Sequence, residues 1–278
     1  EAIDIEITTK CNLACSYCYI GMAKLKNEKT FGGMSDELIE DVFTLIEKYG
    51  YKEQVEVTYP NGSKTRKGPT HISFYGGEPI VDFERVKYFV EKSKEKGMKL
   101  QFSLLSNGMV GNPAIHKYLK ENNIYVQRSI DGCPEVQEKD RPGSIKPYLA
   151  MTKLFKDYAQ TRRMTVQPAF AKTLLKSLQW FEEQGFTGGM SPMANYYTEW
   201  SEEHIADFLK SLWELGQYYV QQWQKGKPFY MYYFSREMAL RFMQPEKGSQ
   251  FGFLGMAGFI CVIGSQRKPT IPNFVLVV

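Results

Sequence analysis

Three cysteines near the amino end have the residue type and the spacing for metal chemistry. The chain contains five cysteines, and Cys11, Cys15 and Cys18 lie within eight residues of sequence. An odd total in a chain that shows no secretory leader argues against a disulfide framework. Zinc in a structural site takes four ligands, but the nearest histidine is His71 and no second cysteine pair exists. Three thiolates in one loop instead favour an iron–sulfur cluster with one iron open to another ligand; zinc and plain buried thiols are the alternatives.

The cysteine spacing, Cys-x3-Cys-x2-Cys with the aromatic Tyr17 before the last cysteine, resembles the signature of radical S-adenosylmethionine (SAM) enzymes. In that family the thiolates hold a [4Fe–4S] cluster, and SAM binds the fourth iron through its amino and carboxylate groups. An electron from the reduced cluster cleaves the S–C5′ bond, and the 5′-deoxyadenosyl radical abstracts a hydrogen atom from the substrate. The resemblance implies two cofactors, the [4Fe–4S] cluster and SAM, and a reducing partner such as flavodoxin or ferredoxin.

A Gly-Gly pair follows the strand predicted over 71–75. Two glycines allow a ligand to approach the backbone closely, and Pro79 prevents the strand from continuing in the ladder. Such a pair alone is more often a mere turn. Directly after this strand, in a chain that carries the cysteine triplet, Gly76, Gly77 and Glu78 with Pro79 resemble the family's GGEP motif. The backbone of that motif contacts the SAM amino group.

Two later strands end in Ser106-Asn107-Gly108 and Ser129-Ile130-Asp131-Gly132. Asn-Gly and Asp-Gly are common turn dipeptides. Both segments also resemble motifs of the peptide- and protein-modifying branch of radical SAM enzymes, where the serine of the second motif and an arginine twelve residues later bind SAM. This spacing leads to Arg141, whose planar and permanently charged guanidinium suits the SAM carboxylate. A solvated charge in the run 138–141 is the alternative.

The resemblance assigns the candidate residues to two groups. The cluster ligands are Cys11, Cys15 and Cys18, and the SAM-binding residues are Tyr17, Gly76, Gly77, Glu78, Ser106, Ser129, Arg141 and Ala194. Tyr17 is expected near the adenine, and Ser129 and Arg141 on the carboxylate and ribose side. Ala194, or its neighbour Met193, stands where relatives contact adenine, although a packed loop fits equally well. No side chain is assigned as catalytic.

Alternating strands and helices must position these residues. Hydrophobic periodicity predicts strands over 3–7, 71–75, 100–105, 125–130, 164–170 and 187–193, and a hairpin inserted over 54–67. Helices are predicted over 35–50, 82–95, 113–122, 145–160, 172–184, 202–225 and 235–243. Six strands alternating with helices imply an α/β fold, a partial (β/α)6 TIM-type barrel, because each crossover returns to the same edge of a parallel sheet. Active-site loops should leave the carboxyl ends of its strands.

The carboxyl-terminal part differs in composition, so we predict a radical SAM core over 1–194 and a mainly helical, aromatic-rich extension over 195–278. Its aromatic rings either cover the open side of the barrel or line a cleft for a large peptide. Peptide-modifying relatives usually carry a cysteine-rich SPASM or twitch extension here, with auxiliary iron–sulfur clusters. This stretch contains only Cys261, so the cysteine count does not support such clusters, and we expect a truncated or incomplete extension. The remaining Cys133 is expected to be a small buried residue.

The composition, with 43% hydrophobic and 24% charged residues, is that of an ordinary globular protein and excludes a disordered or collagen-like chain. The net charge of +4 is too small and too evenly spread to indicate a nucleic-acid partner, and no apolar run is long enough to span a membrane. The resemblance implies an oxygen-sensitive cytoplasmic enzyme that modifies a precursor peptide or protein side chain through a thioether or carbon–carbon crosslink, epimerisation or oxidation. The alternatives are an anaerobic sulfatase-type maturase that forms formylglycine and a catalytically silent barrel module that binds zinc.

Overall fold

The computed structural model describes residues 2–21, 32–50, 55–58, 64–67, 70–109, 111–154, 161–186 and 190–227, together with Met231 and Phe234. The described residues form two compact units. The first contains those in Glu1–Ser129 and Glu138–Gln160, and the second those in Ile130–Gln137 and Thr161–Leu276. Among the described residues of both units, no helix has both the length and the apolar character needed to cross a membrane.

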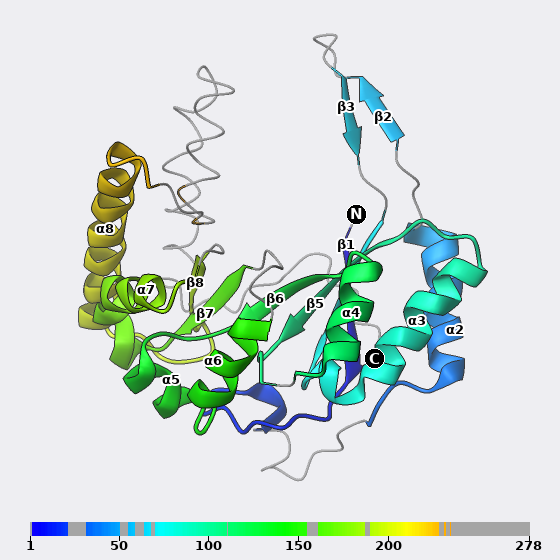
Figure 1. Ribbon diagram of the computed structural model, residues 1–278, viewed down its shortest axis with the longest axis horizontal. Helices are drawn as coiled ribbons and strands as arrows, with labels where there is room; N and C mark the ends of the chain where they lie inside the picture. The colour runs from blue at the N-terminus through cyan, green and yellow to red at the C-terminus, as the bar shows by residue number, and fades with distance from the viewer. Residues whose placement is uncertain are drawn as a thin grey trace. The chain divides into compact units, whose positions relative to one another are not determined.

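A parallel strand ladder is the framework of the first unit (Figure 1). Its strands are, in spatial order, β1 (Ala2–Thr8), β4 (His71–Gly76), β5 (Gln101–Ser106) and β6 (Tyr125–Ser129). The register aligns one buried apolar residue from each strand in a single row: Ile5, Phe74, Leu104 and Val126. The same register pairs Thr8 with Gly76 and Ser106 with Arg128, so the loops that carry the motifs leave from one edge of the ladder.

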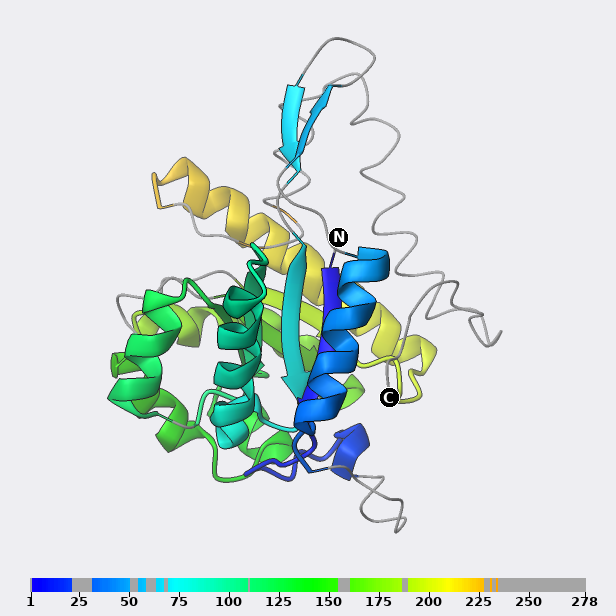
Figure 2. The same cartoon turned by 90° about the vertical axis from the view of Figure 1, so that its right-hand side faces the viewer.

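Helices α2 (Asp36–Leu45), α3 (Phe83–Glu95) and α4 (Pro113–Glu121) lie along one face of this ladder (Figures 1 and 2). Helix α2 begins where predicted, because the Ser35 side chain accepts a hydrogen bond from the Leu38 amide. Their apolar faces join the strands in one core, in which the Phe89 ring lies 4.5 Å from that of Phe43 and 5.3 Å from that of Phe74, measured between ring centroids. This packing fixes the strand ends from which the loops depart.

The predicted hairpin is confirmed as the antiparallel pair β2 (Val55–Thr58) and β3 (Lys64–Lys67). Its turn, predicted around 60–62, lies outside the described residues. Helix α6 (Ile145–Leu154) matches the first ten residues of the helix predicted over 145–160, and the rest of that range is not described. The short helix α5 (Pro134–Asp140), which precedes α6, was not predicted.

The second unit contains the parallel strands β7 (Arg162–Val166) and β8 (Met190–Ala194), with α7 (Leu174–Glu183) between them in the chain. The strand predicted over 164–170 is too long at its carboxyl end. Pro168 has no amide hydrogen for a ladder and instead begins a 3-10 turn over Pro168–Thr173. The alternation of strands and helices continues through both units, which confirms the predicted α/β class.

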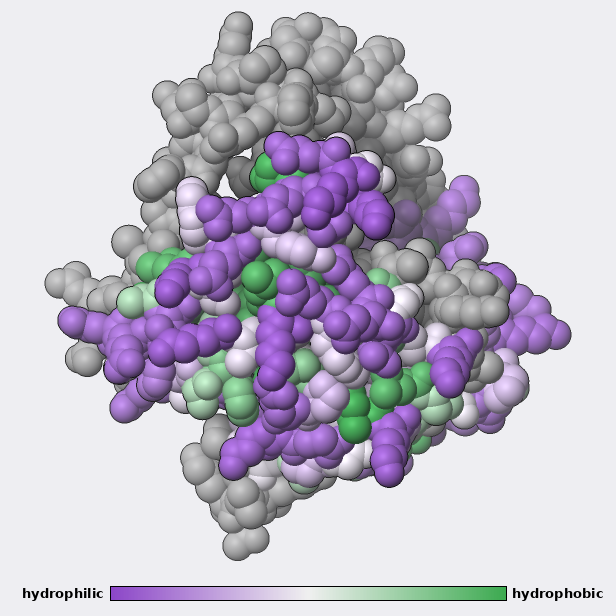
Figure 3. All heavy atoms as spheres, turned by 60° about the vertical axis from the view of Figure 1, so that its left-hand side comes forward, coloured by the Kyte–Doolittle hydropathy of each residue, from purple (hydrophilic) through white to green (hydrophobic). Residues whose placement is uncertain are grey.

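Helix α8 (Glu202–Gln224) is the last helix among the described residues of the second unit, and it matches the helix predicted over 202–225. Its aromatic residues divide between core and surface: Phe208 and Tyr219 are buried, whereas Trp213 is 70% exposed. Hydrophilic side chains predominate on the face of the molecule in Figure 3. The helix predicted over 235–243 lies outside the described residues.

Candidate functional site

The cysteine loop follows β1 directly. Cys11, Cys15 and Cys18 are half-buried thiols that form no disulfide. The Sγ of Cys11 accepts a hydrogen bond from the Leu13 amide at 3.4 Å and a longer one from Nδ2 of Asn107 at 4.0 Å. The Cys18 amide donates to the Cys15 carbonyl at 3.1 Å, which closes a tight turn between these two cysteines.

This donor set fits an iron–sulfur cluster by its chemistry. Such clusters take cysteine thiolates as ligands, and N–H donors to the sulfur stabilise the negative charge. Within the described ranges, no three His, Cys, Asp or Glu side chains are grouped as a ready-made site for a single metal ion. The thiols of Cys11, Cys15 and Cys18 form no disulfide, and their chemistry is that of cluster ligands.

The loop after β4 is packed directly against the backbone of the cysteine loop. The Gly77 amide donates to the Thr8 carbonyl at 2.8 Å, and the Glu78 amide donates to the Lys10 carbonyl at 2.7 Å. A Cβ atom on Gly77 would lie 2.2 Å from the Lys10 carbonyl oxygen, and one on Gly76 would lie 2.1 Å from that of Thr8. Both glycines are thus required for the close approach of this loop to the backbone of the cysteine loop.

Glu78 joins this loop to the one after β5. Its side chain is fully buried; Oε1 accepts from the Ile80 amide at 3.1 Å, and Oε2 accepts from the Asn107 amide at 2.5 Å. Burial raises the pKa of the Glu78 carboxyl to about 7, although these bonds, one with the Ser106 side chain and the positive charge of Arg141 oppose the rise. The buried Glu78 side chain therefore links the loop after β4 to the loop after β5.

The Ser106-Asn107-Gly108 turn reaches the cysteine loop through its asparagine. Ser106 is buried and its Oγ accepts from the Gly108 amide at 3.0 Å, which is ordinary turn chemistry. Asn107 is also buried, and its Nδ2 donates to Oδ1 of Asn12 at 2.7 Å in addition to its contact with Cys11. We predicted a role for Ser106 and missed Asn107. The position of this asparagine in the same motif could have indicated it.

The end of α5 holds the middle of the cysteine loop. Ser16 donates twice to Asp140, from its amide to the carbonyl at 2.9 Å and from Oγ to Oδ1 at 3.0 Å. Arg141 donates from Nη2 to the phenol oxygen of Tyr17 at 2.5 Å. Asp140 and Arg141 are only 4% and 7% exposed, so the alternative of a solvated charge does not apply to Arg141. Neighbouring Glu138 instead accepts from two amides near the start of α6.

The structure therefore connects most of the predicted residues within the first unit: the cysteine loop with Tyr17, Gly76, Gly77, Glu78, Ser106 and Arg141. Ser129 is half-buried at the carboxyl end of β6 in the same unit. Ala194 belongs to the second unit, where it is buried and paired with Val166 across β7 and β8. Cys133 is buried, as predicted.

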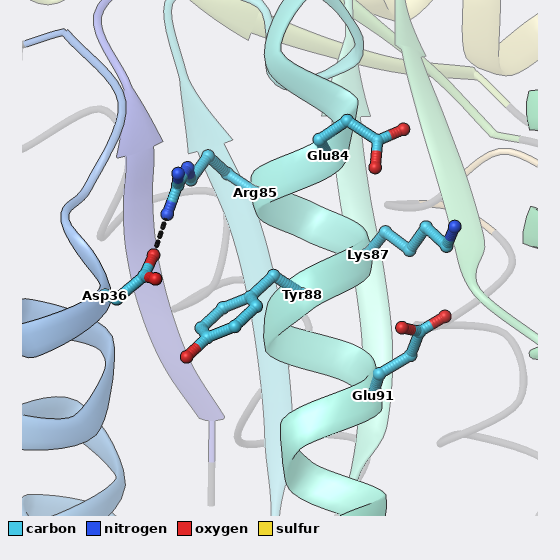
Figure 4. Close-up of a pocket in the computed structure, with 6 residues that line it drawn as sticks. All are labelled: Asp36, Glu84, Arg85, Lys87, Tyr88 and Glu91. Atoms are coloured by element: carbon cyan, nitrogen blue, oxygen red, sulfur yellow. Dashed lines mark hydrogen bonds and ion pairs between the residues drawn. The ribbon is translucent and has the colours of Figure 1, made fainter.

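A groove of about 250 Å³ lies on the helical side of the first unit and contains none of these residues. It is lined by Asp36, Glu84, Arg85, Lys87, Tyr88 and Glu91. Figure 4 shows Arg85 of α3 reaching Asp36 of α2, with which it forms an ion pair, while Glu84 and Lys87 project on the opposite side of α3. An exposed ion pair of this kind contributes little to stability, and the groove offers no thiol.

The family model of the radical SAM superfamily matches residues 5–212, well over half of the chain. The chain belongs to the radical SAM superfamily. Membership implies a [4Fe–4S] cluster and SAM, and the cysteines of the family signature are present as Cys11, Cys15 and Cys18.

Several curated proteins are similar to this radical SAM chain. A cysteine-type anaerobic sulfatase-maturating enzyme of Clostridium perfringens is 26% identical over 226 residues, which cover 74% of this chain and 57% of that protein. The radical SAM cyclopropyl synthase TigE of Paramaledivibacter caminithermalis is 27% identical over 132 residues, or 47% of this chain and 27% of that protein. The chain thus spans less than two thirds of the length of these relatives.

Solved structures give the same fold. The structure described as native anSMEcpe with bound AdoMet matches with a TM-score of 0.67 and 20% identity, over 88% of this chain and 66% of that chain. The structure of native anSMEcpe with bound AdoMet and Cp18Cys peptide matches with a TM-score of 0.65 and 21% identity, over 86% and 64% of the two chains. This likeness confirms the partial TIM-type barrel.

Proposed function

We propose that this radical SAM chain is part of an enzyme that modifies a peptide or protein side chain. The observation that carries the proposal is the cysteine triplet, held in place by the loops that follow β4 and β5 and by the end of α5. The curated relatives named as sulfatase-maturating enzymes act on a protein, which supports a polypeptide substrate. Because the chain spans 57% of the first of them, the substrate and the activity of the whole protein belong to the proposal.

In this proposal, Cys11, Cys15 and Cys18 hold the [4Fe–4S] cluster, and SAM takes the open iron. When bound, these two groups supply a 5′-deoxyadenosyl radical that removes a hydrogen atom from the substrate. Arg141 is buried and positively charged, so it can pair with the SAM carboxylate, and Tyr17 directs its guanidinium.

The other predicted SAM contacts stay part of the proposal. They are backbone contacts from Gly76, Gly77 and Glu78 to the amino group, together with contacts from Ser106, Ser129 and Ala194. We also retain the division into a core over 1–194 and an extension over 195–278, a reducing partner of the flavodoxin or ferredoxin class, and a cytoplasmic setting, because an open cluster is sensitive to oxygen.

Anaerobic reconstitution of the full chain with iron and sulfide tests the proposal. We expect a brown protein with about four irons and four sulfides per chain, whose colour is bleached by dithionite and which releases 5′-deoxyadenosine from SAM. Replacing Cys11, Cys15 and Cys18 together by alanine should abolish the colour, the bound iron and sulfide, and the release of 5′-deoxyadenosine. The matched variant Cys133→Ala should keep all of them. A colourless protein that binds one zinc per chain would refute the proposal and favour the silent module.

Formation of formylglycine is the second candidate, because three of the curated relatives are named cysteine-type anaerobic sulfatase-maturating enzymes. Anaerobic turnover with a cysteine-containing sulfatase peptide, followed by mass spectrometry, separates the candidates. Conversion of cysteine to formylglycine removes the sulfur and lowers the peptide mass accordingly. A thioether crosslink retains the sulfur and removes two hydrogen atoms, and epimerisation leaves the mass unchanged.

A further inference from the structure

We propose that Asp140 is a positioning residue that holds the turn between Cys15 and Cys18 in the conformation that receives the cluster. This inference rests on the proposed function, since it assumes that these cysteines bind a cluster. Asp140 acts through Ser16, which lies between Cys15 and Cys18 and is 124 positions away in the sequence.

The turn itself is tight and defined by its own backbone. The Cys18 amide donates to the Cys15 carbonyl, so Cys15 and Cys18 are the outer residues of a four-residue turn and Ser16 and Tyr17 are its two central residues. Fixing the central residues of such a turn also fixes the directions in which its outer side chains leave the backbone. The geometry of two of the three candidate ligands therefore depends on what holds Ser16 and Tyr17.

Ser16 is held by two hydrogen bonds to one residue. Its amide donates to the Asp140 carbonyl at 2.9 Å, and its hydroxyl donates to Oδ1 of the same residue at 3.0 Å. Two bonds to one partner define both the position and the orientation of the Ser16 backbone. The adjacent pair, Tyr17 and Arg141, extends this contact by one residue in each segment.

The end of α5 is by itself an unfavourable position for the negatively charged side chain of Asp140. It is the last residue of α5, where the helix dipole disfavours a negative side chain, and it is 4% exposed. The final carbonyls of a helix also lack partners within the helix. Ser16 supplies an amide for the carbonyl and a hydroxyl for Oδ1 of the carboxylate. The cysteine loop thus contributes to the stabilisation of this buried carboxylate.

A double-mutant cycle with Asp140→Ala and Ser16→Ala tests the inference. The first readout is the rate at which reconstituted protein loses iron to a chelator under anaerobic conditions. We expect this rate to rise about 3- to 10-fold in each single variant, as for the loss of one partly buried hydrogen bond to a charged group, and to rise no further in the double variant. Asp140→Asn retains a side-chain acceptor and should remain close to wild type. Lys139→Ala changes an exposed neighbour on the same helix and is the matched control.

Hydrogen exchange of the metal-free protein is the second readout and does not depend on the cluster. Amides of residues 15–18 should exchange faster in Ser16→Ala and Asp140→Ala than in wild type or Lys139→Ala. Unchanged iron loss in Ser16→Ala would overturn the inference, as would fully additive effects in the double variant. If wild-type protein binds no cluster, the proposed function fails; equal exchange rates in wild type and Ser16→Ala would then overturn the inference separately.

Discussion

Nη2 of Arg141 lies 2.5 Å from the phenol oxygen of Tyr17 and donates a hydrogen bond to it. The guanidinium carbon is also 5.5 Å from the centroid of the Tyr17 ring. The two residues belong to different sequence motifs, yet each limits the orientation of the other. The aromatic residue of the cysteine signature therefore directs the cation that the motif spacing assigns to the SAM carboxylate.

Tyr17→Phe removes the phenol oxygen and keeps the aromatic ring. We expect the affinity for SAM to fall about 3- to 10-fold, because Arg141 loses a charged hydrogen bond and must be ordered when the ligand binds. The rate of 5′-deoxyadenosine formation at saturating SAM should change little. Titration calorimetry with reconstituted protein measures the affinity. Arg141→Ala, which removes the charge itself, should weaken binding further; equal affinities of wild type and Tyr17→Phe would contradict this role.

Glu78→Ala should destabilise the protein by about 3 kcal/mol at pH 6, since it leaves the buried amides of Ile80 and Asn107 without their acceptor and creates a cavity. Urea unfolding followed by circular dichroism measures the change. Glu91→Ala, an exposed carboxylate on α3, is the matched control and should change stability by less than about 0.5 kcal/mol. Similar values for the two variants would show that the Glu78 carboxylate does not link the loops.

The stability of the wild type relative to Glu78→Gln should fall as the pH rises from 4.5 to 7. Burial raises the pKa of the Glu78 carboxyl from its ordinary value of 4.5 to about 7, so between these values the folded state binds more protons than the unfolded state. Its favourable contribution is complete below pH 4.5 and lost above 7, with a total change of about 3 kcal/mol. Chemical unfolding of both proteins at several pH values measures the difference; a constant difference would contradict the prediction.

Gly77→Ala should reduce both stability and iron content. The new Cβ would lie 2.2 Å from the Lys10 carbonyl oxygen, so the start of the cysteine loop must move. We expect a loss of about 2–4 kcal/mol in the free energy of unfolding, with most of the bound iron lost. Gly97→Ala is the control: its backbone φ is +70° but no atom lies within 4 Å of the new Cβ, so it should cost only about 1 kcal/mol and keep the iron. Equal iron contents would contradict a role of Gly77 in loop packing.

The sequence was sufficient for those parts of the fold that local pattern determines. Ser35 predicted the start of α2, and the GGEP resemblance correctly led to the loop that packs on the cysteine loop. Helix α5 could not be predicted in this way, because its seven residues are mostly polar and its charged end is buried by a partner far away in the sequence. The importance of Asn107 was missed for a similar reason, since its contacts with Cys11 and Asn12 arise only from the register of β1, β4 and β5.

The contact between Ser16 and Asp140 also has a consequence for biosynthesis. Cys11, Cys15 and Cys18 leave the ribosome before Asp140, the residue that fixes the turn between two of them and that follows Ser16 by 124 positions. A nascent chain therefore presents thiols without their final geometry throughout that interval. Delivery of iron and sulfide should accordingly succeed on the folded polypeptide and fail on a chain stalled before Asp140.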